Sequence, residues 1–405
     1  MKTNNNITSY RFQGYTNAWE LRKLGEVARF RRGSFPQPYG NSEWYDGDGA
    51  MPFVQVADVT DEMNLVEDTK QKISKKAQPL SVYAEKGSVL VTLQGSIGRV
   101  AITQYGAFID RTVLIFENFY LPIDNLFWAY VIKQKFIEEA KSAPGGTIKT
   151  ITKEVLSDFN IKLPTHPEQK AIGTFFSTLD QQITLHQRKL DTLKEQKKTY
   201  LKLLFPSKGQ TKPALRFQGF EDDWELRKLG EVAEMYSGGT PSVGKKEFYE
   251  GDIPFIRSAE INSNNTELFL SELGLSNSSA KMVNKGDLLY ALYGATSGEV
   301  GLAKISGAIN QAILAIIPSI DYSSNFLLQW LKREKNNIIE KYLQGGQGNL
   351  SGAIVKDFSI MFPTLPEQET IGTFFQTLDQ EMVQVEDKLA SLKEMKKTLL
   401  RKLFV

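Results

Sequence analysis

The ten residues WELRKLGEVA occur twice in this chain, at positions 19–28 and again at positions 224–233. In both copies the match extends upstream to the residues RFQG. A second strong match pairs PTHPEQKAIGTFFSTLDQ, from Pro164, with PTLPEQETIGTFFQTLDQ, from Pro363. The repeat period of about 200 residues is far too long for a solenoid. The sequence therefore predicts a duplicated unit, in which each copy has one globular body followed by one helix.

The two bodies are predicted to be mixed α/β, with more strand than helix. The runs GSVLVTL, DLLYALYG, TVLIFE and AILAIIP are short and apolar, which is typical of buried strands. Residues 125–141 and 325–343 have the apolar spacing of helices, and Gly-Gly pairs follow at 145–146 and 345–346. We expect the fold class to be α/β (α+β), with two homologous bodies.

After each PEQ, apolar residues recur at alternating steps of four and three, which is a heptad seam. The main seam positions are Ile172, Phe176, Leu179, Ile183, Leu190, Leu193, Ile371, Phe375, Leu378, Met382, Leu389 and Leu392. At ~1.5 Å per residue, each helix would reach on the order of 55 Å. Because so long a helix with an apolar stripe needs a partner, we expect the two helices to pair within one chain. The alternative is that each helix packs only on its own body.

Two lysines indicate the direction of this pairing. Lys197 and Lys396 occupy equivalent seam positions, so a parallel pair would bury one against the other. An antiparallel pair instead sets Lys197 near Leu378 and Lys396 near Leu179, where each ammonium can reach water. The helical segments carry net charges of about +5 and about −1, which also favours mutual pairing. We predict an intramolecular antiparallel coiled coil with pseudo-twofold symmetry.

Several classes of function are disfavoured by composition. The chain has no cysteine, so it has no disulfide and no thiolate zinc site, and its histidines, His166 and His186, do not form an HExxH pattern. No apolar run reaches the ~18 residues that span a bilayer, and the polar start is unlike a signal peptide. We expect a cytoplasmic protein without a membrane segment or a metal site.

No motif in the sequence indicates catalysis. GTPSVGKK, from Gly239, is close to a phosphate-binding loop, but Lys246 replaces the Ser or Thr that holds magnesium, so we interpret it as a surface loop. Two of the three Glu-x-Lys pairs, at 195–197 and 394–396, lie on the predicted coiled coil, where they are typical solvated charges. No tetrapeptide of the NPPY or DPPY type occurs. We expect no catalytic residue and no cofactor in this chain.

What remains is a binding architecture. Two similar bodies at a fixed separation suit duplex DNA, whose groove repeats every ~34 Å. The loops of the bodies differ most in polar residues, and Arg, Asn and Gln are the side chains that read base edges. The candidate DNA-binding residues are Arg29, Arg31, Arg32, Ser34, Gln55, Arg99, Arg111 and Lys149 in the first body and Tyr236, Thr240, Lys245, Arg257, Tyr293, Asn310, Gln311 and Asn349 in the second. Ordinary surface variation between duplicates is the alternative.

The order of body, LPTHPEQKAIGTFFSTLDQQI helix, body and LPEQETIGTFFQTLDQ helix resembles the specificity subunit of type I restriction-modification systems. The resemblance covers essentially the whole chain. It implies target-recognition domains at 1–163 and 216–362, conserved helices at 164–206 and 363–405, and a linker at 207–215. It also implies that the domains each read one half of an interrupted double-stranded DNA site.

The same resemblance implies the partners. Two methyltransferase subunits would dock on the conserved helices, and restriction/translocase subunits would join through them. S-adenosylmethionine and ATP would then be held by those partner subunits. A rival hypothesis is a dumbbell-shaped coiled-coil scaffold that binds no DNA, and another is an enzyme that acts alone.

Overall fold

The computed structural model describes residues 11–142, 151–343 and 349–404. The predicted Gly-Gly pairs and Lys149 lie outside these ranges. The chain divides into two compact units, the first formed by Met1–Gln187 and Asp387–Val405, the second by Arg188–Glu386. Each unit therefore contains one body and a segment of each long helix.

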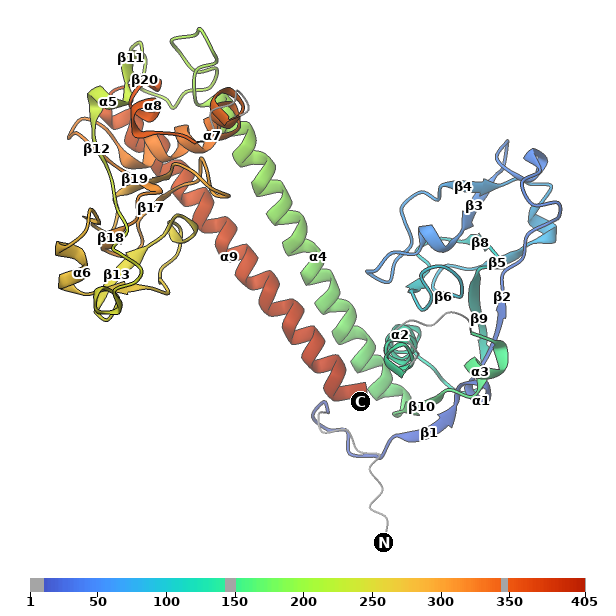
Figure 1. The fold of residues 1–405 in the computed structure, drawn as a ribbon. Helices are drawn as coiled ribbons and strands as arrows, with labels where there is room; N and C mark the ends of the chain where they lie inside the picture. The colour runs from blue at the N-terminus through green and yellow to red at the C-terminus, as the bar shows by residue number, and fades with distance from the viewer. Residues whose placement is uncertain (1–10, 143–150, 344–348, 405) are drawn as a thin grey trace. The chain divides into compact units, whose positions relative to one another are not determined.

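The body of the first unit contains two four-stranded sheets (Figure 1). One sheet has the order β2-β9-β6-β7, and the other has the order β4-β3-β8-β5. The apolar runs predicted as strands form β6 and β9, and both are buried where they cross the core. The strands are β2 (Ala28–Arg32), β3 (Met51–Val54), β4 (Gln71–Ile73), β5 (Val82–Ala84), β6 (Val89–Thr92), β7 (Val100–Ile102), β8 (Ala107–Ile109) and β9 (Val113–Phe119).

The second unit repeats this topology strand for strand. Its sheets have the orders β12-β19-β16-β17 and β14-β13-β18-β15. The strands are β12 (Ala233–Ser237), β13 (Ile253–Ile256), β14 (Phe269–Leu270), β15 (Lys281–Val283), β16 (Leu288–Ala291), β17 (Val300–Leu302), β18 (Gly307–Ile309) and β19 (Ile313–Pro318). The prediction of two homologous mixed α/β bodies is confirmed.

The repeated decapeptide forms a strand and a helical turn at the start of each body. In the first copy, Trp19 is 1% exposed in the core, and β1 (Glu20–Lys23) pairs antiparallel with β10 (Asn160–Leu163), the strand that leads into the long helix. The helical turn α1 (Leu24–Val27) then buries its two apolar residues. The second copy does the same through β11 (Glu225–Lys228), α5 (Leu229–Val232) and β20 (Ser359–Phe362).

Both helices predicted within the bodies are present. They are α2 (Asn125–Ser142) and α7 (Ser324–Leu343), and each contributes buried aromatic residues to the core beneath its sheet. The shorter helices are α3 (Lys153–Ser157) in the first body and α6 (Glu272–Ser276) and α8 (Gly352–Lys356) in the second.

The long helices are α4 (His166–Leu203) and α9 (Leu365–Phe404), with 38 and 40 residues. Most of the predicted seam positions are buried, as a heptad seam requires. Ile183 and Met382 are only half-buried. Ile183 still packs against the first core. The tips of the helices continue into the bodies, since Phe404 contacts Trp19 in the first unit and Phe205, just beyond α4, contacts Trp224 in the second.

Ion pairs show that the helices run antiparallel within each unit. Lys396 pairs with Asp180 in the first unit, and Lys197 pairs with Asp379 in the second. The partner of each lysine is thus the aspartate that directly follows the leucine we predicted as its neighbour. Each ammonium also has a carboxylate partner, which the sequence did not reveal.

A buried ion pair fixes the start of each long helix. The guanidinium of Arg11 bonds to both carboxylate oxygens of Glu168, whose side chain is 1% exposed. Arg216 and Glu367 form the same pair in the second unit. The sequence did not reveal these arginine partners. These pairs explain why RFQG is repeated along with the decapeptide.

Candidate nucleic-acid interface

In the first body, two loops meet at one edge of a sheet. Strands β3 and β8 are parallel, with Val54 opposite Ile109. Gln55 follows the first of these strands and Asp110 follows the second. Because parallel strands end at the same edge, residues distant in sequence are brought together there. We call Tyr39, Gln55, Asp110 and Arg111 the first edge cluster.

Hydrogen bonds connect the members of this cluster. The Tyr39 hydroxyl donates to Asp110 Oδ2 at 3.0 Å, and Gln55 Nε2 donates to the Tyr39 oxygen at 3.1 Å. The guanidinium of Arg111 lies over the Tyr39 ring, 5.3 Å from its centroid. Burial and the neighbouring Asp110 carboxylate raise the pKa of Tyr39 to about 12. Tyr39 therefore keeps its proton at neutral pH.

Asp110 anchors the cluster to the body. It is 1% exposed, and its Oδ1 accepts from the Thr112 backbone N–H at 2.9 Å and from the Thr112 hydroxyl at 2.5 Å. The Tyr39 ring packs on Phe35 with ring centroids 4.9 Å apart. Hydrogen bonds to Thr112 and the packing of Tyr39 on Phe35 thus fix the polar groups of the cluster to the body.

The second body has the same edge with different side chains. Strands β13 and β18 are parallel, and Arg257 and Asn310 directly follow them. The Asn310 side chain accepts from the Ala312 N–H at 3.2 Å, as Asp110 does from Thr112. The hydroxyl of Thr240 donates to Gln311 Oε1. We call Thr240, Arg257, Asn310 and Gln311 the second edge cluster.

Two carboxylates hold Arg257. Its guanidinium donates to Glu260 at 2.9 and 3.1 Å and to Glu267 at 2.7 Å. Burial alone would raise the pKa of Glu260, but the hydrogen bonds from Arg257 and from two backbone N–H groups outweigh it and lower that pKa to about 2. The hydrogen bonds that Arg257 donates to Glu260 and Glu267 raise the pKa of Arg257. The positive charge at this edge is therefore compensated within the protein.

A model of the type I restriction modification DNA specificity domain matches this chain twice, over residues 16–195 and 221–394. The two matches contain both sheets of each body, both edge clusters and most of each long helix. The chain belongs to the type I restriction-modification specificity family.

Several curated specificity subunits are similar to this chain. The MjaVIII specificity subunit of Methanocaldococcus jannaschii is 22% identical over 383 residues, which cover 89% of this chain and 86% of that protein. The MjaIX specificity subunit of the same organism is 28% identical over 165 residues, or 39% of this chain. That second match spans only 38% of the relative's own length.

Solved structures of the family have the same fold. The S subunit from M. genitalium superposes with a TM-score of 0.64 at 18% identity, and 97% of each chain is covered. A chain from a study of the assembly and conformational transition of the type I restriction-modification system gives 0.51 at 19% identity. The likeness confirms the predicted fold class of a specificity subunit.

The other candidate residues of this family member are dispersed over the two bodies. Arg29 and Arg31 both pair with Glu117 of β9, and Arg99 pairs with Asp61. The side chains of Arg32, Ser34 and Tyr236 donate to the backbone carbonyls of Ile151, Leu80 and Met282. Lys245 lies over the Phe248 ring, and Tyr293 packs against the hydrophobic core of the second body. Asn349 is exposed. The structure therefore gathers Gln55 with Arg111 at the first edge, and Arg257, Asn310 and Gln311 with Thr240 at the second.

Sequence reasoning missed residues that complete each cluster. Tyr39 lies in the loop GSFPQPYGN, in which only Ser34 was a candidate from the sequence. Glu260 and Glu267 were not considered. The available signal was the Arg-to-Glu spacing of three residues after a strand, where the 3-10 turn η6 (Ser258–Glu260) begins.

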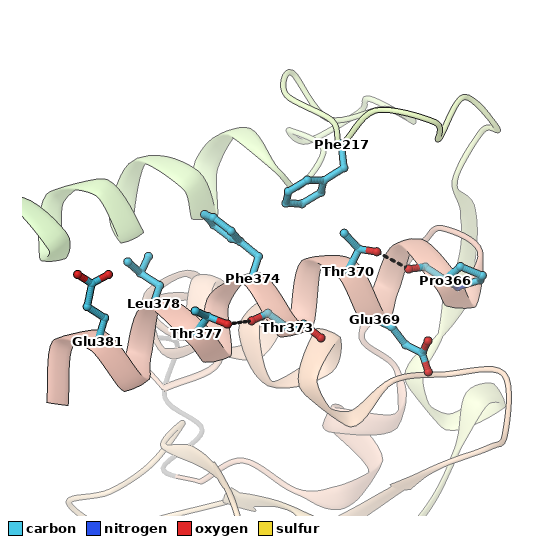
Figure 2. A pocket seen from close by; sticks show the side chains of 9 residues that line it. All are labelled: Phe217, Pro366, Glu369, Thr370, Thr373, Phe374, Thr377, Leu378 and Glu381. Atoms are coloured by element: carbon cyan, nitrogen blue, oxygen red, sulfur yellow. Dashed lines mark hydrogen bonds between the residues drawn. The ribbon is translucent and has the colours of Figure 1, made fainter. Parts of the chain in front are cut away.

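A groove lies along α9 in the second unit (Figure 2). The rings of Phe217 and Phe374 meet edge to face, with their centroids 5.7 Å apart. The hydroxyls of Thr370 and Thr377 bond to helix carbonyls at 2.8 and 2.9 Å, which makes the groove less polar than its sequence suggests. The lining residues are Phe217, Pro366, Glu369, Thr370, Thr373, Phe374, Thr377, Leu378 and Glu381.

The first unit has the matching ring pair, Phe12 and Phe175, at 5.4 Å. The residues that correspond to Glu369 and Glu381 there are Lys170 and Gln182. Among the described residues, no group of three His, Asp or Glu side chains could hold a metal ion, and no helix is long and apolar enough to cross a bilayer.

Proposed function

We propose that this chain is the DNA-reading subunit of a type I restriction-modification complex. Each body reads one half of an interrupted double-stranded DNA site through its edge cluster. Two methyltransferase subunits dock on the conserved helices, and restriction/translocase subunits join the complex through them. S-adenosylmethionine and ATP are held by those partners, and this chain supplies no catalytic group.

One observation carries this proposal. The two bodies share every strand of their topology, yet the residues after the parallel strands differ at each matched position: Gln55 against Arg257, and Arg111 against Gln311. Glutamine, arginine and asparagine are the side chains that pair with base edges in the major groove. A common frame with different polar tips is what two readers of two different half-sites require.

The groove supports the docking of methyltransferases. An apolar groove with an aromatic pair is a typical anchor site for a protein partner. Because the ring pair recurs in both units, the same kind of partner fits both. Two such ring pairs per chain favour two methyltransferase subunits.

Co-expression of this chain with a methyltransferase subunit of the same restriction-modification system tests the reading function. We expect methylated adenines at one interrupted sequence when the genome of the expressing strain is mapped. The scaffold hypothesis predicts no sequence-dependent methylation. It also predicts that the assembled complex binds mixed-sequence DNA duplexes no more tightly than a protein without DNA-binding function.

Docking is tested with Thr373→Arg, which places a long cation in the groove. We expect loss of methyltransferase from the purified complex, because the side chain fills the space between the rings and Leu378. Ser391→Arg is the matched control, since Ser391 is an exposed small residue of the same helix. Equal methyltransferase content in both variants would rule out the groove as the docking site.

A further inference from the structure

The chemistry of the first edge cluster fixes the orientation of one amide. A carboxylate only accepts hydrogen bonds, and a tyrosine hydroxyl has a single proton. Since Tyr39 contacts Asp110 Oδ2 at 3.0 Å, its proton lies in that bond. The Tyr39 oxygen can then only accept from Gln55. Gln55 must therefore present its NH2 group to Tyr39, and this leaves its carbonyl oxygen turned away.

The remaining hydrogen-bonding capacity of Gln55 follows directly. Its NH2 group has two protons, and one is used by the Tyr39 oxygen at 3.1 Å. One N–H donor and the C=O acceptor of the same amide remain. The backbone on either side is also held, because the Gln55 N–H donates to Asp58 Oδ2 at 2.8 Å. Gln55 is half-buried, so the amide is supported yet accessible.

Only one base offers the complementary pair in the major groove. Adenine presents the N7 acceptor beside the N6 amino donor. Guanine presents two acceptors, so its O6 would face the Gln55 carbonyl. Cytosine supplies only a donor, and thymine supplies only an acceptor beside its methyl group. A rotatable glutamine could adapt to several bases, whereas one held by Tyr39 and Asp110 cannot.

The second edge cluster lacks this arrangement. Arg257 occupies the place of Gln55 and has no acceptor, and Asn310 occupies the place of Asp110. Asn310 keeps the same turn bond, which shows that an asparagine fits the position in this fold. No amide therefore stands at the position of Gln55 in the second body.

We propose that Gln55 reads an adenine in the half-site of the first body, and that Tyr39 and Asp110 are positioning residues that fix its amide. This inference rests on the proposed DNA-reading function. It identifies one base edge and the residue that recognises it.

The first experiment maps methylation by the complex that contains Gln55→Ala. We expect one adenine position of one half-site to become degenerate, with a loss of preference of roughly 5- to 150-fold. The other half-site remains unchanged and reports that the complex still folds and assembles. Gln13→Ala, at an exposed glutamine outside the cluster, should leave both half-sites intact.

Two further variants test the positioning role. Tyr39→Phe keeps the ring on Phe35 and removes the hydroxyl, and Asp110→Asn installs the residue that the second body uses. In each variant the Gln55 amide can take both orientations. We expect partial degeneracy at the same position as in Gln55→Ala, with methylation elsewhere unchanged. Variants that merely weaken the body would lower methylation at all sites without changing the preferred base.

A binding experiment on the assembled complex identifies the base atoms. Duplexes carry 7-deazaadenine at the adenine in question, which removes N7 but leaves base pairing intact. We expect the wild-type complex to lose affinity for the modified duplex and the Gln55→Ala complex to bind both duplexes equally. An equal loss in both complexes overturns the inference, as does an unchanged site in the methylation maps of Gln55→Ala. Wild-type methylation without any sequence preference would instead overturn the proposed function itself.

Discussion

The two edge clusters occupy the same position in the same sheet topology, but different contacts hold their polar side chains. In the first, a neutral amide is oriented by Tyr39 and Asp110, and the Arg111 cation lies over an aromatic ring. In the second, the only arginine of the cluster is bonded to Glu260 and Glu267.

This difference shows which part of each body is constrained. The strands and the turn bond of Asp110 or Asn310 are common to both, because they close the ends of the parallel strands. The side chains that extend beyond this frame differ between the two bodies. The contrast predicts two readers of different chemistry, one that relies on an oriented amide and one with a compensated charge.

Replacing residues 28–159 with residues 233–358 should have the largest effect. The chain would then carry two second bodies on unchanged flanking strands. We expect the methylated site to contain two copies of one half-site, and the original first half-site to be lost. Each mismatched base pair costs about 1–3 kcal/mol in specific DNA binding, so discrimination against the old site should be nearly complete. Methylation that persists at the original first half-site would contradict one reader per body.

The charge of each cluster can be compared through the salt dependence of DNA binding. We expect Arg111→Gln to reduce the slope of log K against log salt concentration by about 1 if Arg111 contacts a phosphate. The change for Arg257→Gln should be smaller, because its charge is already compensated by two glutamates. Titrations of the assembled complex between low and moderate salt measure both slopes. Equal slopes for the two variants would show that the ion pairs open on DNA.

The smallest expected effect concerns acid stability. The folded-state pKa of Glu260 is about 2, below its value of ~4.3 in an unfolded chain. A depressed carboxylate pKa stabilises the fold above the unfolded pKa, and this contribution is lost as pH falls from ~4.3 toward ~2. We expect the difference in urea stability between wild type and Glu260→Gln to be largest at pH 6, to be smaller near pH 3 and to be nearly lost near pH 2. A difference that stays constant between these pH values would show that the ion pair does not couple to folding.

Much of the fold could be read from local pattern. The heptad steps predicted both long helices, because a buried seam has to follow the helical period whatever its partner is. The position of Lys197 and Lys396 in that seam was enough to predict antiparallel pairing, since two buried like charges exclude the parallel register. The repeated PEQ and WELRKLGEVA segments marked the same elements in both copies, because identical residues form the same strand and helical turns.

Only the tertiary structure decided which residues meet at the edges. Gln55, Tyr39 and Asp110 are separated by loops whose lengths carry no periodic signal, and their contact depends on the parallel pairing of β3 with β8. Parallel pairing joins segments far apart in sequence, so no local spacing reveals it. The same reason hid the bonds of Arg11 to Glu168 and of Arg257 to Glu267. The sequence by itself determined the duplicated frame, its strands and its helical seam, whereas folding determined which polar groups hold one another and which face outward, because a hydrogen bond depends on distance in space and not on distance along the chain.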